Sequence, residues 1–216
     1  MVLESIINPL YAERNPKRMV FIGFIYTTIA IFLSIWVFGD SASLVMVFLT
    51  TLACVPLFYR TIRIEEQKDE TIESEMTLLK EHGKTLSFFM FLFLGIVLAC
   101  VIWYVVLPMH TTQSLFSIQT GTINRVNDSA TGAAIQSSIF LKILFNNLRV
   151  LLFCVLFAFV YGVGAIFILT WNATVIGAAI GNFIRTGLSG LALEMGFAKA
   201  GGYLQIISIG LFKYSI

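Results

Sequence analysis

The chain has 216 residues, of which 58% are hydrophobic and 12% charged, and its formal net charge is +2. Soluble domains average roughly 45–50% apolar and about 25% charged residues, so this composition excludes an ordinary water-soluble domain. The small net charge, spread beside apolar runs, also argues against nucleic acid as a partner. We expect a lipid bilayer to surround the protein.

Four runs without a charged residue are each long enough to cross a bilayer, namely Met19–Phe38, Ala42–Tyr59, Leu86–Leu107 and Val150–Trp171. A membrane-spanning helix needs about 20 apolar residues. The first run lacks a small-residue cleavage site, so we interpret it as a retained span and not as a signal peptide.

The pattern changes after Trp171, where the uncharged stretch Asn172–Ile184 is only 13 residues long. As a helix it would measure about 20 Å, which is less than a hydrocarbon core of about 30 Å. We interpret it as a half-length or re-entrant segment, or as one half of a broken span. The sequence thus predicts an all-α, polytopic transmembrane helix bundle with four full spans plus one or two partial or re-entrant helices. Residues 1–216 then form a single integral membrane domain.

Lys and Arg residues flank the runs unevenly. They lie before the first run and between the second and third runs, whereas Arg125 is the single Lys or Arg in the connections at the other ends of these runs, residues 39–41 and 108–138. By the positive-inside rule the N-terminus and the charged helical connector 61–85 are cytoplasmic, and residues 108–138 form an extracytoplasmic loop. The expected location is the cell membrane, with several spans.

The connector 61–85 carries charges of both signs and a thin apolar edge formed by Ile72, Met76 and Leu79. One interpretation is a docking surface for a cytosolic partner. The other, which we favour, is that the helices of the second and third spans extend into water and pair with each other, because charge runs are usually solvated faces.

Polar groups stand unusually close to the start of the fourth run. Ser138, Lys142, Asn146 and Arg149 form one helical stripe, and Asn147 lies off it. Lys142 and Arg149 are explained by side chains that reach the lipid headgroups. Asn147 is explained better by a hydrogen bond to a neighbouring helix. We therefore predict that Asn147 and Arg149 bond across helices or line a polar cavity.

Small residues follow. Gly162 and Gly164 interrupt the fourth run, and Ala173, Gly177 and Gly181 recur at intervals of four. Such faces let helix backbones approach closely. We expect this face to pack against another helix, in this chain or in a second copy, so a homo-oligomer remains an open alternative.

Chemistry is sparsely encoded. The four runs contain no Asp or Glu, which argues against a proton-coupled pump. His82 and His110 lie at opposite ends of a run and cannot share a metal ion. Ser189 stands in a Gly-Leu-Ser-Gly sequence typical of intramembrane proteases, but no histidine follows it as a base. We predict no enzyme activity, no cofactor and no metal.

The chain resembles the stage II sporulation protein M family. The residues that carry this resemblance are the segment Asn146-Asn147-Leu148-Arg149-Val150, Gly162, Gly164, Trp171-Asn172, Gly177 and Gly181. The likeness is strongest over Ile139–Gly181. It implies a multi-pass membrane protein of bacterial or archaeal type in which the asparagine-arginine segment is a hallmark. Similar members carry a later His-Gly-x-x-Glu motif, so relative to the family the C-terminus is expected to be truncated at Ile216.

The sporulation member works with membrane-anchored, wall-degrading partners in membrane remodelling. The resemblance therefore implies a non-catalytic scaffold or assembly partner in a membrane complex, with other membrane proteins as partners. The alternative is a permease or channel subunit whose polar path is lined by the asparagine-arginine segment and the glycine-rich helices. The structural or interaction residues expected are Asn146, Asn147, Arg149, Gly162, Gly164, Asn172, Gly177 and Gly181.

Overall fold

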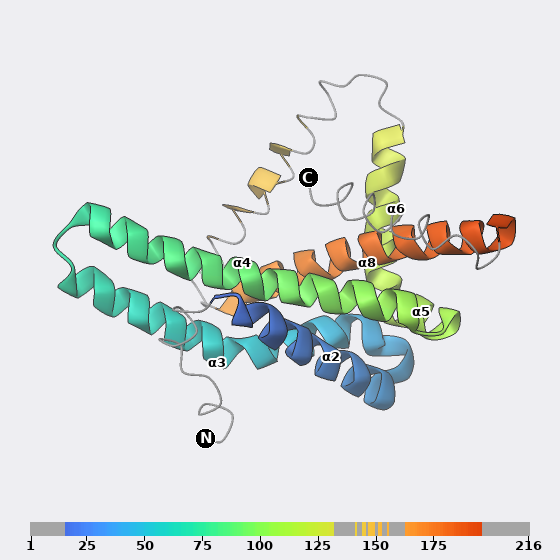
Figure 1. Cartoon of the computed structure of the whole chain (residues 1–216), viewed down its shortest axis with the longest axis horizontal. Helices are drawn as coiled ribbons and strands as arrows, with labels where there is room; N and C mark the ends of the chain where they lie inside the picture. The colour runs from blue at the N-terminus through green and yellow to red at the C-terminus, as the bar shows by residue number, and fades with distance from the viewer. Residues whose placement is uncertain are drawn as a thin grey trace.

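The computed structural model describes residues 16–131, 141, 144–145, 147–149, 151–152, 155 and 163–195. All regular structure in this part of the chain is helical, which confirms the predicted all-α class (Figure 1). The continuous elements are α2 (Arg18–Phe38), the short 3₁₀ turn η2 (Gly39–Ser41), α3 (Ala42–Thr71), α4 (Glu75–Val106), α5 (Met109–Leu115), α6 (Ser117–Thr131) and α8 (Val163–Met195).

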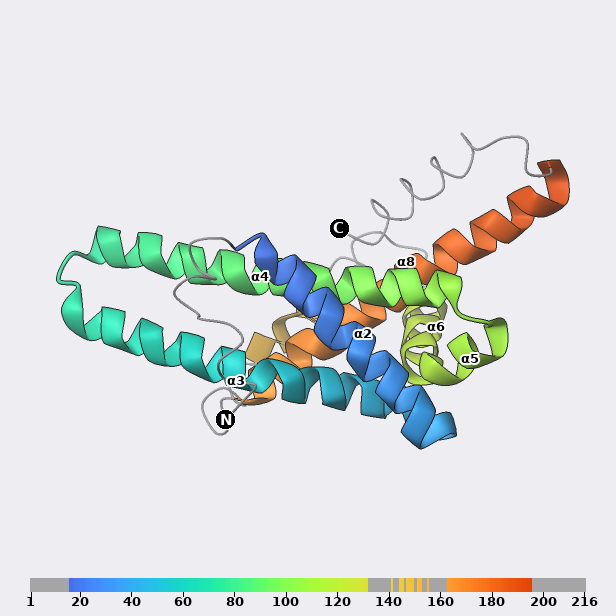
Figure 2. The same ribbon diagram turned by 60° about the horizontal axis from the view of Figure 1, so that its bottom comes forward.

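Three helical stretches among the described residues are long and apolar enough to cross a membrane: Arg18–Thr71, Glu75–Val106 and Gly164–Ser189. The first contains both α2 and α3, because the chain reverses at η2, where Gly39 has a φ of +46° (Figure 2). Large apolar side chains on these helices are exposed, among them Phe21 and Trp36. Lipid accommodates such faces at no cost, whereas water does not.

The long helices form a ring around one core. α2 packs along α4 and against α3, and α8 packs against α4 and α3, so the order around the ring is α3, α2, α4 and α8 (Figure 2). Fully buried side chains from all four helices fill its centre: Met19, Ile31, Met46, Val47, Phe88, Leu92, Ile96 and Ile166.

Glycines bring the backbones of α2 and α4 into direct contact. A Cβ atom on Gly95 would lie 2.1 Å from the carbonyl oxygen of Val20, and one on Gly23 would lie 2.5 Å from that of Leu92. Neither position accepts a side chain without a shift of the opposite backbone. Beside this contact the Trp103 indole donates a hydrogen bond to Thr28 Oγ1 at 3.0 Å.

The predicted division of the chain at Trp171 is wrong. α8 runs unbroken from Val163 to Met195, so Asn172–Ile184 is the interior of a long helix and not a separate half-length segment. The Asn172 side chain donates to the Ile168 carbonyl at 2.9 Å, four residues back in the same helix. A polar side chain that bonds its own backbone does not end a helix. Four full spans are therefore not confirmed, since much of Val150–Trp171 lies outside the described residues.

The segment 108–138, expected as a loop, folds into two helices as far as it is described. α5 follows α4 after Pro108, and α6 lies across α8 instead of along it (Figure 1). Leu115, the last residue of α5, and Phe116, which separates α5 from α6, are fully buried. This part of the chain is thus anchored in the core of the protein.

The connector 61–85, which we call the finger, is formed by extensions of α3 and α4 with only Ile72–Ser74 between them. Figures 1 and 2 both show the two helices side by side, projecting away from the other helices. This matches the interpretation that the helices of the second and third spans extend and pair. The predicted apolar edge is open, since Met76 and Leu79 are exposed.

Candidate functional site

One group of polar side chains joins three helices inside the protein. Gln119 is fully buried. Its Oε1 accepts a hydrogen bond from Ser43 Oγ at 2.8 Å, and its Nε2 donates to Thr174 Oγ1 at 3.4 Å. Ser43 Oγ also accepts a bond from the Ile118 amide at 3.3 Å. We call Ser43, Gln119 and Thr174 the Gln119 junction; it joins α3, α6 and α8.

Replacing Gln119 by leucine is expected to destabilise the protein by about 1–3 kcal/mol, because a buried amide is removed from two hydroxyl partners. The measurement is the midpoint of thermal unfolding of the detergent-solubilised protein. Gln113→Leu is the matched control, since Gln113 lies exposed on neighbouring α5. Equal midpoints for the two variants would show that the Gln119 junction contributes nothing to stability.

A second group surrounds the C-terminus of α4. Arg185 of α8 donates to the carbonyl oxygens of Tyr104 and Leu107, both at 2.9 Å, and to Thr112 Oγ1 at 3.0 Å. The last carbonyls of a helix have no partner within that helix, and they carry the negative end of its dipole. The guanidinium therefore satisfies α4 and holds α5 against it. We call Arg185, Tyr104, Leu107 and Thr112 the Arg185 junction.

The glycine face of α8 lies directly beside the Arg185 junction and packs against α4 of the same chain. A Cβ atom on Gly177 would lie 2.5 Å from Cys100 Cβ, and one on Gly181 would lie 2.6 Å from Tyr104 Cβ. Ala173 is fully buried on the same helix. Tyr104 also donates its hydroxyl to Asn182 Oδ1 at 3.3 Å. The face thus positions Tyr104 and Arg185 for their hydrogen bonds.

The other predicted site residues do not join these groups. Gly164 is half-buried in the first turn of α8, and Asn172 bonds within its own helix. Asn147 and Arg149 are helical and exposed. The cross-helix hydrogen bonds expected for Asn147 and Arg149 stay a prediction. Asn146 and Gly162 lie outside the described residues.

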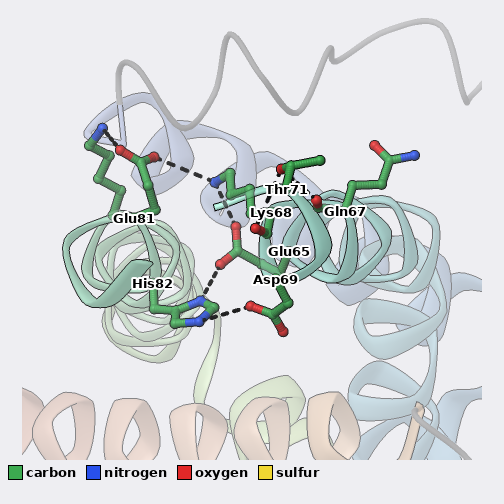
Figure 3. A network of polar contacts seen from close by, with 8 residues as sticks. Glu65, Gln67, Lys68, Asp69, Thr71, Glu81 and His82 are labelled. Atoms are coloured by element: carbon green, nitrogen blue, oxygen red, sulfur yellow. Dashed lines mark hydrogen bonds and ion pairs between the residues drawn. The ribbon is translucent and has the colours of Figure 1, made fainter. Parts of the chain in front are cut away.

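A third group of polar contacts lies in the finger, beyond the charge-free runs (Figure 3). His82 of α4 holds two carboxylates of α3: its Nδ1 lies 2.7 Å from Glu65 Oε2, and its Nε2 lies 3.2 Å from Asp69 Oδ1. Lys68 pairs with Glu65 at 2.6 Å and with Glu81 at 3.7 Å. These five residues, which we call the finger network, tie the two helices together.

Glu65 is the most buried carboxylate of the finger network, with its side chain 11% exposed. Burial raises the pKa of Glu65, but hydrogen bonds from Lys68, His82 and Thr85 outweigh burial and hold that pKa below its ordinary value. A carboxyl whose pKa is lowered by folding stabilises the folded state above its unfolded pKa. That contribution is lost as the pH falls through the lower, folded value.

We therefore expect Glu65→Gln to weaken the finger at neutral pH and to lose that effect as the pH falls through the lowered pKa of Glu65, below which both side chains are uncharged. Amide hydrogen exchange of residues 61–85, corrected for intrinsic rates, measures the difference. Glu66→Gln is the control, because Glu66 is exposed on the same turn. A difference between wild type and Glu65→Gln that persists at low pH would contradict the assignment.

Sequence reasoning missed both junctions. In the sequence Arg185 directly follows the uncharged stretch Asn172–Ile184, and a charged residue inside a long apolar helix calls for a named partner. Gln119 lies in a polar stretch that resembles an exposed loop, and its neighbours Leu115 and Phe116 were the available signal that this stretch is buried.

The fold and its polar groups define the class of protein. It is an all-helical protein whose long apolar helices suit a membrane and whose two junctions are hydrogen-bonded between helices. A sequence model of stage II sporulation protein M matches residues 85–209. The chain therefore belongs to the stage II sporulation protein M family, as its sequence motifs predicted. No curated protein and no solved structure matches the chain. The matched region begins at Thr85, where the finger enters the apolar part of α4.

Proposed function

We propose that this protein is a non-catalytic, multi-pass scaffold or assembly partner in a complex of the cell membrane, acting in membrane or envelope remodelling. Its N-terminus and finger lie in the cytoplasm, and α5 and α6 lie on the opposite side. The partners are other membrane proteins, as the wall-degrading enzymes are for the sporulation member of the family.

The close backbone packing of the helix ring is the observation behind this proposal. Gly23 and Gly95 close the contact between α2 and α4, while Gly177 and Gly181 close the contact between α4 and α8. A permeation path needs a gap between helices, and it needs polar groups that line this gap. Closely packed helices favour a rigid body that presents surfaces to partners.

Four buried hydroxyls of α2 and α3 support the same proposal. Thr50, Thr51 and Thr61 of α3 each donate to the carbonyl four residues back in their own helix. Ser34 of α2 likewise bonds Ile31, three residues back. These four hydroxyl groups donate to the backbone of their own helix, so that hydrogen is not available to a solute between the helices.

Reconstitution in sealed liposomes tests the proposal against the permease or channel alternative. Purified full-length protein should leave trapped ions, amino acids and sugars inside the vesicles at the rate of protein-free controls. Solute-specific flux that increases with protein content would refute the scaffold role. In native membranes, photo-crosslinking from exposed finger positions such as Met76 should yield a discrete complex with a second membrane protein.

A further inference from the structure

We propose that His82 is a pH-operated clamp that joins α3 to α4 in the finger, closed when the imidazole is doubly protonated and open when it is neutral. This inference rests on the geometry of the finger network alone. It stands whether or not the scaffold role is correct.

The two ring nitrogens of His82 face two different carboxylates. Nδ1 lies 2.7 Å from Glu65 Oε2, and Nε2 lies 3.2 Å from Asp69 Oδ1 (Figure 3). Both distances are hydrogen-bond distances. The contact with Glu65 is a hydrogen bond, and the contact with Asp69 is an ion pair when the ring is charged. An ionised carboxylate presents only lone pairs, so both contacts are attractive at once only when both ring nitrogens carry a proton. Only the imidazolium ion has two N–H groups.

Loss of one proton breaks one side of the clamp. A neutral imidazole keeps a single N–H, so its other nitrogen presents a lone pair to a carboxylate oxygen. Glu65 is nearly buried and is also held by Lys68, whereas the Asp69 side chain is 56% exposed. Water can hydrate the Asp69 carboxylate more readily than the nearly buried Glu65 carboxylate. The contact between His82 and Asp69 therefore opens first.

The position suits a switch. The His82 side chain is 39% exposed, so protons exchange freely with the solvent. Histidine is the side chain whose charge ordinarily changes between about pH 5 and 8. The charged groups around His82 are Glu65, Lys68 and Asp69 on α3, and Glu81 with its partner Lys84 on α4.

The clamp lies at the end of α3 that leads into the turn Ile72–Ser74. Asp69 is the last residue on α3 held by the finger network, two residues before that helix ends. Opening this contact therefore frees the tip of the finger, where Met76 and Leu79 are exposed, while Glu65 and Lys68 still hold its base.

Spin labels at Glu70→Cys on α3 and Leu79→Cys on α4 report the distance across the tip in full-length protein in nanodiscs, with the native cysteines replaced. His110→Gln leaves His82 as the only histidine of the chain. We expect one narrow distance distribution at about pH 5.5 and an added, longer population at about pH 8.5. A distribution that is the same at both pH values would overturn the proposal.

Two variants separate the clamp from a general loss of structure. His82→Ala should give the longer population at both pH values, because alanine has no side-chain donor for either carboxylate. Asp69→Asn should keep the narrow distribution at both, because an asparagine amide donates to the nitrogen of a neutral imidazole. A wild-type pH response in His82→Ala, or an Asp69→Asn finger that still opens at high pH, would contradict the clamp. Ring ¹⁵N spectra should show two protonated nitrogens only in the closed state.

Discussion

Gly95→Ala is expected to lower the stability of the protein by about 3 kcal/mol, a large effect for one methyl group. The added Cβ atom would lie 2.1 Å from the carbonyl oxygen of Val20, and the neighbouring atoms are also backbone, so no side chain can move aside. α2 and α4 must separate, which opens the most extensive helix contact of the bundle. The thermal unfolding midpoint in detergent should fall by roughly 10 °C.

Gly83→Ala is the matched control, since Gly83 lies in the same helix and nothing is within 4 Å of its added Cβ atom. Alanine removes the entropic cost of glycine in a helix, so this variant should gain about 0.5–1 kcal/mol. The two substitutions are chemically identical and should have opposite signs. If both raised the midpoint, α2 and α4 would not be in backbone contact.

Arg185→Met should cost about 2–4 kcal/mol, because hydrogen bonds from a charged donor contribute more than neutral ones and their acceptors would lose their partner. The Tyr104 and Leu107 carbonyls would then have to find other donors at the end of α4. We expect a lower unfolding midpoint and faster amide exchange in α5, which Arg185 holds through Thr112.

Arg125→Met provides the comparison for this second variant. Arg125 is exposed on α6 and donates to the Gly121 carbonyl of its own helix, so its replacement should change stability by less than about 0.5 kcal/mol. Arg185→Lys should recover part of the loss, since an ammonium group also donates to carbonyls. No recovery, together with equal losses for Arg125→Met and Arg185→Met, would rule out the Arg185 junction as a stabilising contact.

The positions of the apolar helices could be predicted from the stretches of sequence that lack charged residues. The runs Met19–Phe38 and Leu86–Leu107 fall within one residue of the apolar parts of α2 and α4, because charged side chains are excluded from lipid-facing helices. The prediction was wrong at α8, where the uncharged but polar residue Asn172 was treated as a boundary. An amide bonded to its own helix causes no break.

The glycines of the candidate site were predictable, whereas its hydrogen-bonded partners were not. Spacing alone marked Gly177 and Gly181 as a packing face, since helix geometry places residues four apart on one side. Which helix they meet depends on the order of helices around the ring, and that order is a tertiary property. Gln119, Ser43 and Thr174 are far apart in the chain, so no local pattern brings them together.

Membrane sidedness of two single cysteines tests the central claim most directly, namely that the helix ring crosses a bilayer with the finger on one side and α5 on the other. Gln67→Cys in the finger and Gln113→Cys on α5 are both exposed positions and are introduced into a protein without its native cysteines. In intact cells a membrane-impermeant maleimide should label Gln113→Cys and should reach Gln67→Cys only after the membrane is opened. Labelling of both positions from the same side would contradict the account.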